Sequence, residues 1–128
     1  LAVIVMIETA EAVENAEEIL AVDGVDGCFI GPNDLALSLG LNPSDIGPGT
    51  AHEAAIRKVL AAAKKTGKAA GKHCFDADDL NLRLEQGFQF LALASDSRFM
   101  SRDAAAQFRT LNLGGAQATP KEEKGRLY

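Results

Sequence analysis

The chain has 128 residues, of which 47% are apolar and 5% aromatic, and its formal net charge is −5. This composition suffices for one globular domain with an aliphatic core, and the acidic balance argues against nucleic acid as a partner. No apolar run approaches the roughly 20 residues that cross a bilayer. The opening "LAVIVMIE" has neither a basic leader nor a cleavage site. We therefore expect a cytoplasmic protein without a membrane partner.

Strand-like and helix-like segments alternate from the beginning of the chain. Residues 1–7 are an apolar run rich in Val and Ile, typical of a strand buried on both faces of a parallel sheet. Apolar positions at helical spacing then predict a helix over 10–21. A second strand-like run, 25–32, closes with Gly and Pro, which cannot continue a ladder. A helical turn over 33–40 and a loop over 40–49 complete this half.

The second half of the chain repeats the alternation. A T-x-x-E capping box at Thr50 begins a helix that we expect to end at Gly67. The remaining segments are a strand at 69–75, a helix at 77–86 with Asp76 as its cap, a strand at 88–94 and a helix at 101–111. After residue 112 turn formers and charges prevail, so 113–128 is expected to be a polar tail.

Four strand–helix units in this order predict an α/β fold with a parallel sheet. They could form a small doubly wound domain, or half of a (β/α)8 barrel, whose usual size is ~250 residues. The "IETAEA" that follows the first strand contains no G-x-G-x-x-G pattern. A dinucleotide-binding fold therefore has no support at the point where it would need it.

Acidic residues stand at the ends of three predicted strands, namely Glu8, Asp34 and Asp96. The carboxyl ends of parallel strands share one edge of the sheet, where chemistry collects in such folds. Carboxylates held close together repel one another unless a cation lies between them, and hard oxygen ligands suit Mg²⁺ or Mn²⁺. A metal bound to two carboxylates would keep open coordination positions, which a 2-oxo acid could fill. The metal would then stabilise the enolate of that acid.

Each acid also has a purely structural interpretation. Glu8 could be an acid that complements the dipole of the next helix, although Thr9 could cap that helix alone. Asn33 or Asp34 could cap the helical turn that follows the second strand. For Asp96 a cap or a solvated loop position is the favoured interpretation.

The histidines and cysteines are expected to be structural. His73 lies within a predicted strand and His52 in the first turn of a helix, where we expect a surface position. Cys28 and Cys74 lie in apolar contexts without C-x-x-C spacing, so we expect reduced, buried thiols.

Two segments resemble a known family. The stretch "VMIETAEAVENAEEILAVDGVDGCFIGPNDLALSLG" resembles the core signature of the HpcH/HpaI aldolase and citrate lyase family, and "GFQFLALASDSRFM" resembles its last barrel strand. These enzymes are metal-dependent carbon–carbon lyases on a barrel of the phosphoenolpyruvate/pyruvate type. The resemblance runs from about residue 2 to 111, and it rests on I-E-T and G-P-N-D-L at this separation. It implies that residues 1–112 are the C-terminal half of a (β/α)8 barrel.

The resemblance also implies roles for particular residues. Glu8 and Asp34 would bind the divalent metal, Mg²⁺ or Mn²⁺. The backbone at Gly31, Pro32 and Asn33 would approach the substrate, with the Asn33 amide facing the carboxylate of the 2-oxo acid. Better-known aldolases carry a glutamine two residues before the metal glutamate, where this chain has Met6.

The expected activity is that of a class II aldolase, which cleaves a 4-hydroxy-2-oxo acid to pyruvate and an aldehyde. Family members carry the acid/base histidine and a substrate-binding arginine in the preceding half-barrel, so this chain is expected to lack a full catalytic set. The alternatives are an acyl-CoA lyase related to citrate lyase β chains, and a non-catalytic half-barrel that acts as an interaction module. The family also implies a homo-oligomer, with the helix at 101–111 packing on another subunit.

Overall fold

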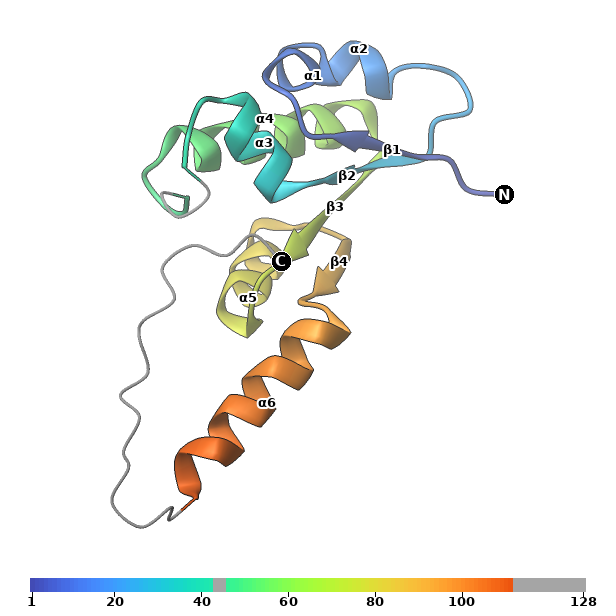
Figure 1. Ribbon diagram of the computed structural model, residues 1–128. Coiled ribbons are helices and arrows are strands. Elements are labelled where there is room, and N and C mark those ends of the chain that lie inside the picture. The colour runs from blue at the N-terminus through green and yellow to red at the C-terminus, as the bar shows by residue number, and fades with distance from the viewer. Residues whose placement is uncertain (43–45, 112–128) are drawn as a thin grey trace. The chain divides into compact units, whose positions relative to one another are not determined.

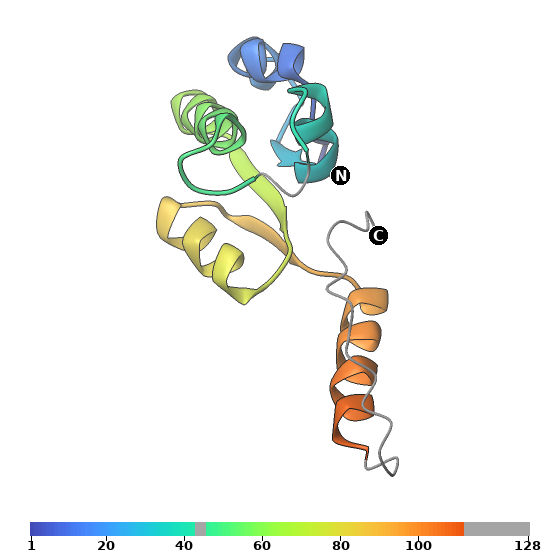
Figure 2. The same ribbon diagram turned by 60° about the vertical axis from the view of Figure 1, so that its left-hand side comes forward.

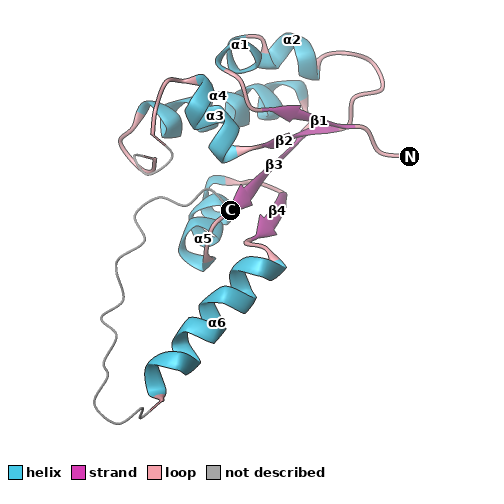
Figure 3. Cartoon of the chain, in the orientation of Figure 1, coloured by secondary structure: helices cyan, strands magenta, loops and turns pink. Residues whose placement is uncertain are grey.

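A computed structural model of the chain describes residues 1–42 and 46–111 (Figure 1). Strands and helices alternate throughout this part, as Figure 3 shows. In chain order the elements are β1 Ile4–Ile7, α1 Ala10–Glu14, α2 Ala16–Leu20, β2 Gly27–Ile30, α3 Pro32–Ser38, α4 Ala51–Thr66, β3 Ala69–Cys74, α5 Ala77–Gln86, β4 Phe90–Leu93 and α6 Asp96–Thr110. The predicted tail over 113–128 lies outside the described residues, as do positions 43–45 of the predicted loop.

The chain divides into two compact units, residues 1–93 and the residues from 94 onward. The first unit holds a four-stranded sheet in the order β1-β2-β3-β4. All three pairings are parallel. The predicted α/β fold with a parallel sheet is therefore confirmed. In the second unit the described element is α6. No described helix combines the length and the apolar character that crossing a bilayer requires.

One face of the sheet forms the core with the helices. Ile7 of β1 and Ile30 of β2 are fully buried, together with Ile56 and Val59 of α4. Figure 1 shows α4 running beside the sheet, and Figure 2 shows α4 and α5 on the same side of β3 and β4. Burial of these aliphatic side chains is the main favourable term in forming this layer.

The other face of the sheet carries exposed apolar side chains, so the prediction that the first strand is buried on both faces is wrong here. Ile4 and Met6 of β1 are 40% and 52% exposed, and Phe90 of β4 is 53% exposed. Successive residues of a strand point to opposite faces. Only the residues of β1 that point toward the helices are therefore covered.

The helix caps predicted at Thr50 and Asp76 are confirmed, whereas two other helices differ from the prediction. Thr50 Oγ1 accepts a hydrogen bond from the Glu53 amide, and Asp76 caps α5 in the same way. The helix predicted over 10–21 is instead two helices that meet at Asn15, whose backbone leaves the helical conformation. The last helix begins earlier than predicted because Ser95 Oγ caps it by accepting from the Arg98 amide.

Both cysteines are free and buried, as expected. They do not face each other, because Cys28 pairs with Ala70 in the parallel register. Burial raises the pKa of each thiol to about 11, so both stay protonated at neutral pH.

We expect Cys28 and Cys74 to resist alkylation in the folded chain. The reactive species is the thiolate, which is scarce at a raised pKa, and the sulfur atoms are out of reach of the reagent. Mass spectrometry after iodoacetamide treatment should show no labelling in buffer and double labelling in denaturant. Rapid labelling in buffer would contradict the burial of these thiols.

Candidate functional site

Glu8 and Gly31 lie side by side because of the strand register. The pairing of β1 with β2 ends at Ile7 opposite Ile30, so the next residue of each strand stands at the carboxyl edge of the sheet. A Cβ atom at Gly31 would collide with Oε2 of Glu8 and would lie 3.4 Å from the Glu8 Cβ. The Glu8 carboxylate therefore occupies space that is free only because residue 31 has no side chain.

Glu8 does not cap the following helix. Thr9 Oγ1 accepts from the Ala12 amide at 3.0 Å and so caps α1. Among the described residues no hydrogen bond or ion pair engages the Glu8 carboxylate. The methyl group of Met6 is a neighbour, since its Cε would lie 3.4 Å from a Cβ at Gly31. One oxygen-donor group thus stands at the strand end with an apolar side chain beside it.

Asp34 lies four residues after the end of β2, in the first turn of α3. The N-cap residue of α3 is Gly31, with Pro32 at the first helical position, so neither Asn33 nor Asp34 caps this helix. Asp34 is an exposed acid in the first turn, and no described residue bonds its carboxylate. Figure 1 shows α3 directly after β2, so Asp34 belongs to the edge of the sheet where Glu8 lies.

A hydrogen bond joins the segments that follow the two strands. The Ala10 amide at the start of α1 donates to Ser38 Oγ near the end of α3 at 2.9 Å. Ala10 comes two residues after Glu8, and α3 contains Asp34. The bond therefore links the start of the helix that follows Glu8 to the helix that carries Asp34.

The described residues contain no group of three or more His, Cys, Asp or Glu side chains that could hold a metal ion. A metal centre here would rest on the two carboxylates of Glu8 and Asp34, with water or substrate at its other positions. This donor set fits Mg²⁺ or Mn²⁺, which prefer oxygen ligands and keep several waters. The two carboxylates, which no described residue bonds, fit such an ion, and Gly31 leaves the room that the Glu8 side chain occupies.

The third strand-end acid, Asp96, has a structural place. It is the first residue of α6, in the second unit of the chain, and its Oδ1 accepts from the Ser97 amide at 2.6 Å. Asp96 therefore complements the start of a helix, which is the interpretation that the sequence favoured.

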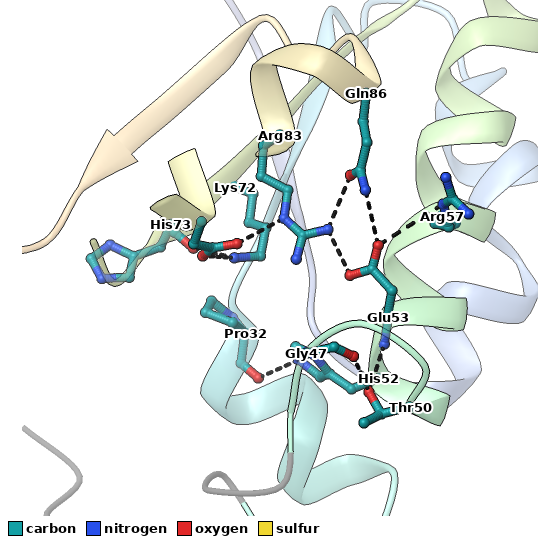
Figure 4. A network of polar contacts seen from close by, with 11 residues as sticks. Pro32, Gly47, Thr50, His52, Glu53, Arg57, Lys72, His73, Arg83 and Gln86 are labelled. Atoms are coloured by element: carbon teal, nitrogen blue, oxygen red, sulfur yellow. Dashed lines mark hydrogen bonds and ion pairs between the residues drawn. The ribbon is translucent and has the colours of Figure 1, made fainter. Parts of the chain in front are cut away.

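A buried polar cluster, which we did not predict, lies between α4, α5 and β3 (Figure 4). Its centre is Arg83, which is 3% exposed. Arg83 Nη1 donates to Glu53 Oε2 at 2.6 Å and to Gln86 Oε1 at 3.0 Å, while Nε donates to Asp79 Oδ1 at 2.8 Å. Gln86 Nε2 donates to Glu53 Oε1 at 3.0 Å. The Arg83 guanidinium thus links α5 to α4 through hydrogen bonds.

Lys72 extends the cluster onto β3. Its ammonium group donates to Asp79 Oδ2 at 2.7 Å and to the carbonyl of His73 at 2.8 Å. Burial alone would raise the pKa of Asp79, but the hydrogen bonds and positive charges of Lys72 and Arg83 outweigh burial and lower it. Asp79 is therefore ionised between two cations at neutral pH.

His52 is buried at 2% exposure, so the expectation of a surface position is wrong. The physical reason is that the first turn of α4 packs beneath the segment that begins α3. His52 Nε2 lies 2.8 Å from the carbonyl oxygen of Pro32, and Nδ1 is buried without a hydrogen-bond partner among the described residues. Because a carbonyl can only accept, Nε2 carries the proton. Burial lowers the pKa of His52, and the charges of Lys72 and Arg83 lower it further.

The spacing of His52 along the sequence indicated a buried position, although a polar residue at a helix start is usually expected at the surface. His52 lies four, seven and eleven residues before Ile56, Val59 and Ala63, which form the buried stripe of α4. That spacing puts all of them on one helical face. A pocket of about 330 Å³ borders His52, Lys72 and Arg83. His73, the other histidine, makes an edge contact with Phe75 at a centroid separation of 5.6 Å.

His52 and Asp79 make the stability of the fold depend on pH. His52 stays neutral when folded, whereas the unfolded chain binds its proton near pH 6.5, so the free energy of unfolding should fall as the pH drops below about 6.5. Asp79 adds a second loss at lower pH: its folded pKa is depressed, so its stabilisation is present above the unfolded value and disappears as the pH falls through the folded one.

Urea denaturation at a series of pH values tests this dependence. We expect the free energy of unfolding to decline from about pH 7 to pH 5. In His52→Gln, which has no imidazole to protonate, the decline over this range should be smaller. An equal decline in both proteins would show that His52 titrates normally in the folded state.

Comparisons with known proteins add to this geometry. A family model described as HpcH/HpaI aldolase/citrate lyase matches residues 1–102. The hydroxypyruvate/pyruvate aldolase of Rhizorhabdus wittichii is 42% identical over 99 residues, covering 77% of this chain and 39% of the relative. The 4-hydroxy-2-oxo-heptane-1,7-dioate aldolase of Escherichia coli is 38% identical over 120 residues, covering 91% and 43%. The chain spans about two fifths of the length of these curated relatives.

Solved structures share the fold. A family protein of Burkholderia cenocepacia has a TM-score of 0.78 and 34% identity, over 85% of this chain and 42% of that protein. The citrate lyase beta subunit of M. tuberculosis, complexed with oxaloacetate and magnesium, has a TM-score of 0.59 and 26% identity, over 81% and 52%. The four parallel strands and their helices are therefore half of a (β/α)8 barrel, as the resemblance implied.

Proposed function

Because this chain belongs to the HpcH/HpaI aldolase/citrate lyase family, we propose that it supplies the metal-binding half of a class II aldolase site. Glu8 and Asp34 hold the divalent ion, and the observation that carries this proposal is the Glu8 carboxylate in the space that Gly31 leaves free. A carboxylate that caps no helix and forms no ion pair with a described residue is available as a metal ligand.

We propose that the ion is Mg²⁺, because a structural neighbour is complexed with this metal, and that Mn²⁺ can replace it. The citrate lyase beta subunit that shares this fold is complexed with magnesium and with oxaloacetate, a 2-oxo acid. When bound, such an ion acts as a Lewis acid that stabilises an enolate. Mn²⁺ is suited to the same oxygen ligands and is convenient for measurement.

The residues of this chain would bind and orient the substrate. We propose that the backbone at Gly31 and Pro32 lies against the 2-oxo acid and that the Asn33 amide meets its carboxylate. Met6 would present an apolar methyl group where the family resemblance leads one to expect an amide. We assign no proton transfer to this chain, since His52 Nε2 is engaged by the Pro32 carbonyl.

The proposed substrates are 4-hydroxy-2-oxo acids, cleaved to pyruvate and an aldehyde. The names of the two relatives, a hydroxypyruvate/pyruvate aldolase and a 4-hydroxy-2-oxo-heptane-1,7-dioate aldolase, support this class. A lyase of acyl-CoA substrates is the second candidate, favoured by the likeness to the citrate lyase beta subunit. The stronger sequence identity to the aldolases supports the first.

We also propose that the chain works as a homo-oligomer in the cytoplasm. Apolar side chains on α6 are exposed, with Phe99 at 48%, Met100 at 72% and Phe108 at 70%. Exposed apolar surface of this kind is typical of a contact with another chain. Analytical ultracentrifugation would test the oligomer, and a monomer at all concentrations would exclude it.

Titration calorimetry with Mn²⁺ in the presence of oxalate, a mimic of the enolate, tests the proposed site. We expect the wild-type chain to bind the ion, and Glu8→Gln and Asp34→Asn to bind it much more weakly because each removes a charged ligand. Glu18→Gln is the matched control, since Glu18 is an exposed acid on the neighbouring α2. Equal binding by all four proteins would overturn the assignment. A folded wild-type chain that binds no Mn²⁺ would instead favour a non-catalytic half-barrel.

A further inference from the structure

His52 forms a hydrogen bond with the backbone of residues 31–34, the segment that we propose binds metal and substrate. It belongs to the first turn of α4, and its ring reaches across to the first residue of α3. The acceptor is the carbonyl of Pro32, which stands between Gly31 and Asn33. We infer that His52 is a positioning residue, which holds residues 31–34 in place for metal and substrate through this hydrogen bond. The inference rests on the proposed function for its consequence in metal binding.

The hydrogen bond is directional and well buried. Nε2 lies 2.8 Å from the Pro32 oxygen, and the His52 side chain is only 2% exposed. Water therefore cannot readily replace His52 as the donor. An unpaired carbonyl would be costly in this setting, so the ring keeps Pro32 where it is.

The surroundings of His52 select the required form of the ring. Nδ1 is buried and has no donor or acceptor among the described residues, so a proton there would be unsatisfied. A proton on Nε2, by contrast, meets the Pro32 carbonyl. Lys72 and Arg83 line the same pocket as His52 and disfavour a positive charge on the ring. The neutral ring with its proton on Nε2 is therefore the form that can hold the segment.

The segment that His52 holds depends on few other contacts. Within it, the Leu35 amide donates to the Gly31 carbonyl at 3.0 Å and closes the first turn of α3. At the far end of α3, Ser38 accepts from Ala10. Among the described residues, His52 is the side chain that forms a hydrogen bond with the backbone of residues 31–34. Loss of that bond should loosen the turn that presents Asp34.

Two variants separate this role from general stability. His52→Leu removes the donor but keeps an apolar side chain of similar size, whereas His52→Gln restores an N–H group at a similar reach. Val59→Ala is the control for destabilisation, since Val59 is fully buried on α4 and belongs to the core cluster. We would measure hydrogen exchange of the Leu35 amide and the affinity for Mn²⁺ with oxalate in the wild-type chain and in each variant.

We expect exchange at Leu35 to quicken and the Mn²⁺ affinity to fall about 10- to 100-fold in His52→Leu, the range found for groups that orient metal ligands. His52→Gln should recover most of both, and Val59→Ala should leave the affinity unchanged. Unchanged Leu35 exchange in His52→Leu, or the same change in Val59→Ala, would overturn the inference. If the wild-type chain binds no Mn²⁺, the proposed function fails, while Leu35 exchange still decides whether His52 holds the segment.

Discussion

Arg83→Met should lower the free energy of unfolding by about 3–5 kcal/mol, the usual cost of removing one partner from a buried ion pair. Arg83 bonds Glu53, Asp79 and Gln86 from a position that is 3% exposed. Methionine fills a similar volume but leaves Glu53 buried without its main cation. Urea denaturation followed by circular dichroism measures the change.

Arg57→Met is the matched control, because Arg57 pairs with the same carboxylate from the surface. Its Nε lies 3.9 Å from Glu53 Oε1, and its side chain is 68% exposed. Exposed pairs of this kind contribute about 0–1 kcal/mol. If the two variants lost the same stability, the cluster around Arg83 would not be the tie between α4 and α5 that its geometry indicates.

Gly31→Ala should weaken Mn²⁺ binding about 10- to 100-fold, as loss of a group that places a metal ligand does. The new Cβ would collide with Glu8 Oε2 and force the carboxylate to move. Backbone strain does not explain such an effect, because the φ angle of Gly31 is −86°, which alanine adopts freely. Titration calorimetry in the presence of oxalate measures the affinity.

A double-mutant cycle shows whether the effect of Gly31→Ala passes through Glu8. In a Glu8→Gln background the weak residual Mn²⁺ binding should respond less to Gly31→Ala, because the carboxylate that the methyl group displaces is already gone. Asn33→Ala in the same backgrounds serves as a comparison, since Asn33 is proposed to meet the substrate and not the metal. Additive effects of Gly31→Ala and Glu8→Gln would show that Gly31 acts by another route.

The fold was largely predictable because its local signals agree. Apolar runs that end at Ile7 and Ile30 gave two strands, and the caps at Thr50 and Asp76 gave two helix starts. The exposed face of β1 was not predictable, since an apolar run indicates a buried strand without saying which layer lies on each side. The break at Asn15 was missed because helical periodicity continues across it.

The candidate site was predictable only in part. The strand-end rule and the family resemblance led to Glu8 and Asp34, and the structure adds that Gly31 leaves room for the first of them. The polar cluster was not predicted, because Glu53 and Arg83 are 30 residues apart and nothing local connects them. The i, i+4 spacing of Asp79 and Arg83 was a visible signal, but it is equally typical of an exposed helix.

Anomalous diffraction from crystals of the chain grown with Mn²⁺ and oxalate tests the central claim most directly, because it locates the metal atom itself. Our account predicts one strong manganese peak at the carboxyl ends of β1 and β2, bonded to carboxylate oxygens of both Glu8 and Asp34. A peak bonded to other residues, or an empty position between these two carboxylates at saturating Mn²⁺, would contradict it.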